Sequence, residues 1–307
     1  MTNFLVQTVM AMVPFILVAQ GTMLSGRAGL FNVSQEGMMM LGAAVGFVTS
    51  WKLGGNNFMG VLVAGLVGAV FGLAFAFLSN LRLDQFVVGL GLFFLAMGLA
   101  TLIYRVAVGV TLTPPRVDTL DRIAIPGLSA IPVIGPMLFN QNWLVYFAVL
   151  LSIGLWWYLY RTNAGMRLRA VGENPKAADS LGIDVNRTKL WAGTAGSALM
   201  AIGGAYLPMV YTGTFTEGIA GGRGWLAIAL AFFGGWRPQL VLVGAAFFAA
   251  LEVLALQAQV SNIGIPHQFI QMLPYVATLL VMIFAFRWVR VPAYLGKNYD
   301  RESRLAG

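Results

Sequence analysis

The chain has 307 residues, of which 59% are hydrophobic and 10% are charged, and its formal net charge is +8. An ordinary soluble domain has roughly 25% charged residues, so this composition excludes a soluble globular fold. Without cysteine and with a single histidine, the chain cannot form a disulfide framework, a thiolate metal site or a histidine cluster. We therefore expect no cofactor and no bound metal.

Nine apolar runs follow one another along the chain. They cover residues 4–23, 38–50, 60–78, 86–104, 143–160, 191–211, 224–236, 240–256 and 269–286. Most approach the roughly twenty residues that a helix needs to cross a bilayer. We therefore expect an all-α, polytopic membrane protein with about nine transmembrane helices, between eight and ten, in one domain over residues 1–307. In the third run, Ala64, Gly68 and Gly72 recur every fourth residue, which predicts close contact with a neighbouring helix.

Three polar segments interrupt or follow these runs. Residues 105–142 contain five prolines, which predict an irregular loop with a short interfacial helix. Residues 161–190 hold six of the nineteen Lys and Arg residues, and they follow an aromatic cluster typical of a membrane interface. Residues 288–307 form a basic tail.

The distribution of basic residues predicts the orientation of the chain. If the tail is cytoplasmic, nine crossings place residues 161–190 on the same side, with fourteen basic residues inside and five outside. Because cytoplasmic loops of membrane proteins are enriched in Lys and Arg, this arrangement is favoured over its inverse. We expect an extracytoplasmic N-terminus and an extracytoplasmic loop at residues 105–142. The basic residues stand at the ends of apolar runs, so we expect no nucleic-acid partner.

Local rules predict a short helix within residues 161–190. Asn174 is a good N-cap, Pro175 suits the first helical position and Gly182 marks an end, so a two-turn helix is expected over residues 174–182. Two alanines in this helix can form a knob that fits a groove of another protein. The same residues also fit an ordinary solvated connecting helix, and both interpretations stay open on these grounds.

Three stretches of the chain resemble one known family. Residues 169–183, RAVGENPKAADSLGI, closely resemble the cytoplasmic loop of ABC importer permeases of the branched-chain amino acid and simple sugar superfamily. Residues 29–43, GLFNVSQEGMMMLGA, and 221–236, GGRGWLAIALAFFGGW, are similar to glycine-rich segments of its nucleoside-type branch. The first resemblance implies a cytoplasmic coupling helix that docks on an ATP-binding subunit. Its residues would be Glu173, Asn174, Pro175, Lys176, Ala177, Ala178, Asp179 and Gly182.

The resemblance implies a non-catalytic permease subunit of an ATP-driven importer in the inner membrane of a bacterial cell. The chain has no P-loop motif, so ATP hydrolysis would belong to another subunit. The implied partners are ATP-binding subunits at two sites, a second permease chain, either a paralogue or a second copy, and an extracytoplasmic solute-binding protein. The expected solute is a nucleoside or a simple sugar, and a branched-chain amino acid is the alternative.

Six residues are candidates for the solute path: Asn32, Gln35, Glu36, Arg223, Trp225 and Glu252. Broken helices in transporters line cavities, so we expect the glycine-rich segments to surround a central cavity. Glu36 can accept hydrogen bonds from a solute, but it can instead cap a helix or pair with Arg27. Glu252 lies within an apolar run and needs a partner, for which Arg223 and Arg237 are candidates. An ion-coupled secondary transporter, with Glu36 and Glu252 as coupling carboxylates, is a further alternative that leaves residues 161–190 without a role.

Overall fold

The computed structural model describes residues 2–109, 113–129, 131–260, 266–285 and 289–300. Over these residues the chain is mostly helical, and five helices are long and apolar enough to cross a membrane. They are α1 (Thr2–Arg27), α3 (Asn57–Asn80), α4 (Gln85–Val108), α6 (Trp143–Arg161) and α11 (Pro238–Val260). The expected all-α membrane protein is confirmed at this level, while the other apolar runs lie in helices that are shorter or less apolar.

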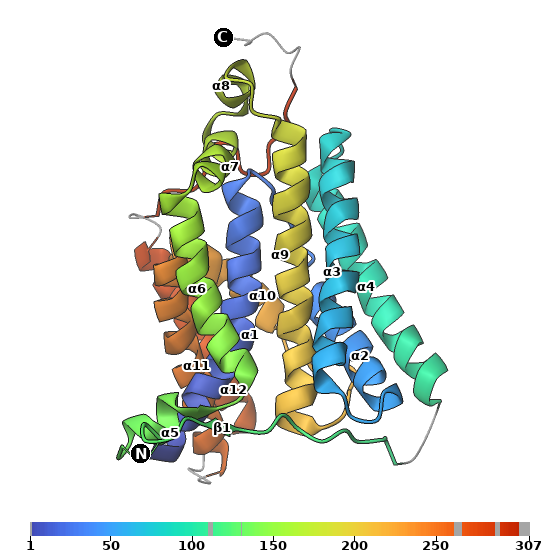
Figure 1. Ribbon diagram of the computed structural model, residues 1–307, viewed down its shortest axis with the longest axis vertical. Coiled ribbons are helices and arrows are strands. Elements are labelled where there is room, and N and C mark those ends of the chain that lie inside the picture. The colour runs from blue at the N-terminus through green and yellow to red at the C-terminus, as the bar shows by residue number, and fades with distance from the viewer. Residues whose placement is uncertain (1, 110–112, 130, 261–265, 286–288, 301–307) are drawn as a thin grey trace.

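The helix α9 (Val185–Leu207) stands between α1 and α3 in the middle of the bundle (Figure 1). Small residues let the backbones of its neighbours approach it closely. A methyl group on Gly196 would overlap Gly21 of α1, and methyl groups on Gly68 or Gly72 of α3 would overlap α9. The close contact predicted from the small residues of the third apolar run is therefore confirmed.

Two helices begin inside the bundle. The helix α2 (Gln35–Lys52) follows an irregular connection at residues 28–34. The helix α10 (Arg223–Phe233) follows the π-helical turn η1 (Pro208–Thr212) and the irregular residues 213–222. A methyl group on Gly224 would overlap the backbone of Gln35 and Glu36, so the two starting points are packed together. The broken helices are as expected, and the absence of a Cβ on Gly224 lets the starts of α2 and α10 pack directly against each other.

The two ends of the molecule differ in character. At one end lie α7 (Asn163–Glu173), α8 (Pro175–Ser180) and the tail, as Figure 1 shows near the label C. At the other end lie the N-terminus, α5 (Ile134–Leu138) and two short antiparallel strands, β1 (Ile123–Ala124) and β2 (Asn140–Gln141). Over its described residues the proline-rich loop is thus irregular with one short helix, although α4 includes the first four residues of the predicted loop, 105–108.

The last long helix, α12 (His267–Ala285), packs against α11 and α10. It runs from the end with the N-terminus towards the end with α8 (Figure 1). The ninth apolar run coincides with this helix, except for residue 286, which lies outside the described residues. Of the basic tail, residues 289–300 are described and the remainder is not.

Candidate functional site

The short helix predicted over residues 174–182 forms α8. The Asn174 side chain caps it, since its Oδ1 accepts a hydrogen bond from the Ala177 N–H at 3.0 Å. Pro175 occupies the first turn, and Gly182 adopts φ +79, which a residue without Cβ adopts easily. The local signals in the sequence therefore correctly predicted both the helix and its ends.

The two alanines of α8 do not both lie on its exposed face, as the predicted knob required. Ala177 is exposed, but Ala178 is 2% exposed and packs with Val171 and Val185 in a small hydrophobic cluster. Ala178 therefore anchors α8 to the rest of the chain. The most exposed apolar side chain here is Leu181, at 81%, which the sequence analysis missed. Its position directly after the last turn, beside Gly182, is the signal that could have indicated it.

The described part of the tail forms hydrogen bonds with several elements at this end of the molecule. Residues 289–300 contact the end of α7, the α1–α2 connection and the turn between α3 and α4. Backbone groups of α7 that have no partner within the helix are satisfied in this way. The contacts are Tyr294 N to Gly172 O (3.0 Å), Ala293 N to Glu173 Oε2 (3.2 Å), Gly296 N to Gly29 O (3.1 Å) and Arg82 Nη2 to Asp300 Oδ1 (2.8 Å).

Glu36 caps a helix, and the helix is α10. Its Oε1 accepts a hydrogen bond from the Gly222 N–H at 2.8 Å, and its Oε2 accepts one from the Gly224 N–H at 2.7 Å. Gly222, at the N-cap position, has no side chain to satisfy these donors, so a carboxylate from another helix does so. The alternative pairing with Arg27 is wrong, because Arg27 Nε donates to Trp236 O at 2.7 Å and its carboxylate neighbour is Glu173.

Asn32 and Gln35 are buried, at 3% and 0% exposure, and their side chains bond the α1–α2 connection and the start of α2 to neighbouring helices. Asn32 Nδ2 lies 3.4 Å from Ser197 Oγ, and Gln35 Nε2 donates to Thr22 Oγ1 at 3.2 Å. Trp225 is 43% exposed, and its ring packs edge-on against Phe93 of α4. Asn32 and Gln35 therefore have protein partners, and none of the three residues lines the two cavities beside Arg223 that are described below.

Arg223 and Glu252 do meet, as an ion pair between the start of α10 and the middle of α11. Arg223 also donates to the carbonyl oxygens of Ile219 and Ala220, each at 3.2 Å. The pair is largely removed from solvent, with side chains 23% and 19% exposed. Arg237, the other candidate partner of Glu252, lies beyond the opposite end of α10.

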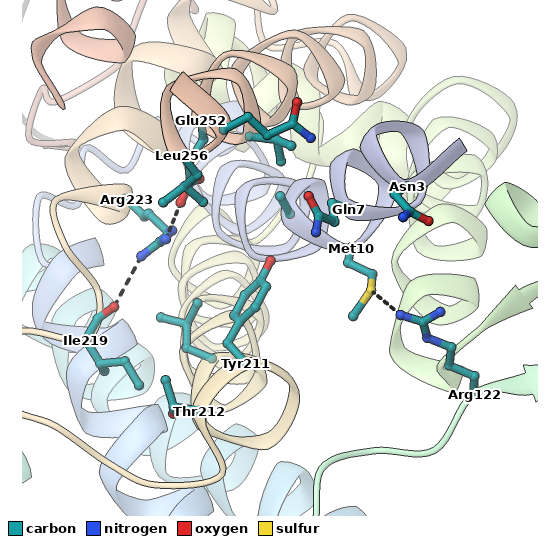
Figure 2. A pocket seen from close by; sticks show the side chains of 14 residues that line it. Asn3, Gln7, Met10, Arg122, Tyr211, Thr212, Ile219, Arg223, Glu252 and Leu256 are labelled. Atoms are coloured by element: carbon teal, nitrogen blue, oxygen red, sulfur yellow. Dashed lines mark hydrogen bonds and ion pairs between the residues drawn. The ribbon is translucent and has the colours of Figure 1, made fainter. Parts of the chain in front are cut away.

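This ion pair lines a cavity of about 900 Å³ at the end of the bundle with the N-terminus. Figure 2 shows the Tyr211 side chain pointing into it, opposite the amide side chains of Gln7 and Asn3 on α1. Apolar groups complete the wall, among them Leu207, Val253 and Leu256. Sequence reasoning missed Gln7 and Tyr211, although a glutamine within the first apolar run was a usable signal.

A second cavity, of about 370 Å³, is lined by Phe15 and Tyr275 among others. Arg223 and Glu252 line both cavities, so the ion pair forms part of both walls. In the described part of the chain no group of three or more metal-ligating side chains is present.

Over nearly its whole length, the chain is similar to permease proteins of ABC transporters. The model of the branched-chain amino acid transport system / permease component family matches residues 4–286. A putative glucose ABC transporter permease protein of Haloferax volcanii is 32% identical, over 96% of both chains. A nucleoside ABC transporter permease protein of Lactococcus lactis is 33% identical over 93% of both, and a guanosine ABC transporter permease protein of Bacillus subtilis is 31% identical over 95% of this chain and 94% of its own. No solved structure matches the chain.

Proposed function

The chain belongs to the branched-chain amino acid transport system / permease component family, and from this premise we propose that it moves a nucleoside or a simple sugar through the cavity beside Arg223 and Glu252. It is a multi-pass membrane subunit of an ABC transporter without a catalytic role, and ATP is hydrolysed by partner subunits. The solute class is supported by relatives named for nucleosides, guanosine and glucose.

The observation that carries the proposal is the Arg223–Glu252 pair in the wall of a cavity of suitable size. Small-molecule sites measure roughly 300–1,000 Å³, and this cavity of about 900 Å³ lies within that range. The two charges neutralise each other, so the site favours a neutral solute. Tyr211, Gln7 and the second oxygen of Glu252 offer hydrogen bonds to hydroxyl groups, while the apolar wall suits one face of a sugar or base.

The two alternatives are less well supported. A branched-chain amino acid is a zwitterion, and its carboxylate and ammonium would have to compete with the ion pair between Arg223 and Glu252. In an ion-coupled transporter, Glu36 would have to bind and release ions. Both of its carboxylate oxygens instead accept backbone hydrogen bonds from α10, which supports a fixed structural role.

We propose that the end with α7, α8 and the tail is cytoplasmic, because fourteen of the nineteen basic residues then lie inside. The N-terminus and the 900 Å³ cavity are then on the extracytoplasmic side, where a solute-binding protein releases its solute. The proposed nine crossings are α1, α2, α3, α4, α6, α9, residues 213–233, α11 and α12. The membrane is the inner membrane of a bacterial cell.

We further propose that α8 docks on an ATP-binding subunit, with Ala177 and Leu181 on its exposed face. Movement of α8 would reach the membrane through α7 and the tail: Tyr294 N in the tail bonds to Gly172 O of α7, and Gly296 N bonds to Gly29 O in the α1–α2 connection. From there Glu36 holds the start of α10, and with it Arg223. The assembly has two permease chains and two ATP-binding subunits, the second permease being a paralogue or a second copy.

Uptake in proteoliposomes that contain the chain, its ATP-binding and permease partners and the binding protein tests the solute assignment. We expect ATP-dependent uptake that is inhibited by nucleosides or sugars. Leu256, which lines the cavity, and Leu254, which does not, are matched residues on α11 at 54% and 48% exposure. Leu256→Trp should reduce uptake and Leu254→Trp should not. Inhibition by leucine, with no effect of any nucleoside or sugar, would support the amino acid alternative instead.

A further inference from the structure

Three arginines surround a cavity at the end of the bundle with α7 and α8. Arg27, Arg169 and Arg237 come from α1, α7 and the residue before α11, and they line a space of about 510 Å³. We propose that this arginine cavity binds the headgroup of an anionic phospholipid. Its other lining residues are Trp156, Tyr160, Gln239 and Leu240. The proposal depends on the chain spanning a membrane and not on which solute it carries.

The positive charge of the arginine cavity is only partly compensated. Arg27 lies 3.9 Å from Glu173, whose side chain is 53% exposed. Neither Arg169 nor Arg237 has a carboxylate within 4.0 Å among the residues that the structure describes. The like charges of Arg169 and Arg237 also repel Arg27. An anion in this cavity would relieve that repulsion.

Arg169 supplies a hydrogen-bond donor that no protein group uses. Its Nε is buried and has no acceptor in the described part of the chain, while its guanidinium lies over the Tyr160 ring at 4.7 Å. A buried donor without a partner is costly, so an acceptor is expected there. The planar guanidinium fits phosphate oxygens in two-point geometry, which favours a phosphate ester as the ligand.

The position of the arginine cavity favours a lipid over a free phosphate ion. Trp157 on α6 is 58% exposed, beside Trp156, and such aromatic pairs mark the membrane interface. On α11, Leu240 lines the cavity and is 45% exposed, and Val243 follows one turn later at 63%. Acyl chains can therefore lie against α6 and α11 while the phosphate meets the arginines. Basic pockets between helices on the cytoplasmic side are known sites for anionic headgroups.

Native mass spectrometry of the purified full chain, with added dioleoyl phosphatidylglycerol or dioleoyl phosphatidylcholine, tests the proposal. We expect one phosphatidylglycerol to bind the wild type more tightly than phosphatidylcholine does. Arg169→Ala combined with Arg237→Ala should weaken it at least about tenfold, which corresponds to losing one charge-assisted bond. Arg237→Ala alone removes an exposed side chain without core packing, so it reports on binding even if the double variant misfolds.

Arg167→Ala is the matched control, because Arg167 is exposed on the same helix and does not line the cavity. Unchanged lipid binding in Arg237→Ala and in the double variant would overturn the proposal. An equal loss in Arg167→Ala would also overturn it, since general surface charge would then explain the binding. Inorganic phosphate is the third arm: displacement of the lipid by millimolar phosphate would show a site for a free anion and contradict the lipid assignment.

Discussion

The carboxylate of Glu36 on α2 accepts a hydrogen bond from the backbone N–H of Gly224 on α10, 188 positions later in the sequence, at 2.7 Å. Its other oxygen accepts one from Gly222 at 2.8 Å. These two bonds flank Arg223, whose guanidinium faces Glu252 on α11. A single carboxylate thus positions the charged wall of the 900 Å³ cavity without contacting that wall directly.

We predict that Glu36→Gln reduces solute uptake about tenfold while the protein still inserts and folds. Glutamine keeps one acceptor oxygen, but its NH₂ group faces an N–H donor. The negative charge of Glu36 at the N-terminus of α10 is also lost, and the two effects together cost about 1–2 kcal/mol. Uptake in the reconstituted system measures the effect.

Glu217→Gln is the control for this variant. Glu217 pairs with Arg105 at 2.9 Å, but both side chains are more than half exposed, so its neutralisation should change uptake little. Unchanged uptake in Glu36→Gln would show that the cap on α10 is not needed to hold Arg223 in place.

We predict that Gly224→Ala destabilises the protein by about 1–3 kcal/mol, the usual cost of overpacking. The added methyl group would overlap the backbone of Gln35 and Glu36, which cannot rotate away as a side chain could. The melting temperature in detergent should fall. Gly91→Ala on α4 is the control, because a methyl group there meets nothing within 4 Å and alanine favours a helix. Equal melting temperatures for the two variants would contradict the close contact of α2 with α10.

Sequence reasoning succeeded where the signal is local. The cap at Asn174 and the small residues at positions 68 and 72 depend on spacing within one helix, and the structure has both features. It failed where two distant segments meet. Nothing near Glu36 shows that its partner is a glycine-rich helix start, and nothing near Glu252 separates Arg223 from Arg237. Both answers depend on how α2, α10 and α11 pack.

We predict that Asn174→Ala weakens assembly with the ATP-binding subunit several-fold. The substitution removes the side-chain acceptor for the Ala177 N–H, and loss of such a cap costs about 1 kcal/mol. In a helix of six residues this is enough to loosen the turn that carries Ala177. Co-purification with the ATP-binding subunit measures it. Asn163→Ala is the control, since Asn163 starts α7 but Thr162 caps it, and an equal loss there would argue against α8 as the docking element.

The last prediction concerns Lys189, which lies at the polar end of α9, outside the apolar run that begins at residue 191. It is 1% exposed, and no acceptor is bonded to it in the described ranges of the chain. A buried ammonium group without a bonded partner destabilises the folded chain. Lys189→Met should therefore raise the melting temperature at pH 7, whereas Lys52→Met, at an exposed site, should not. A lower melting temperature for Lys189→Met at pH 7 would instead mean that the ammonium group stabilises this end of α9.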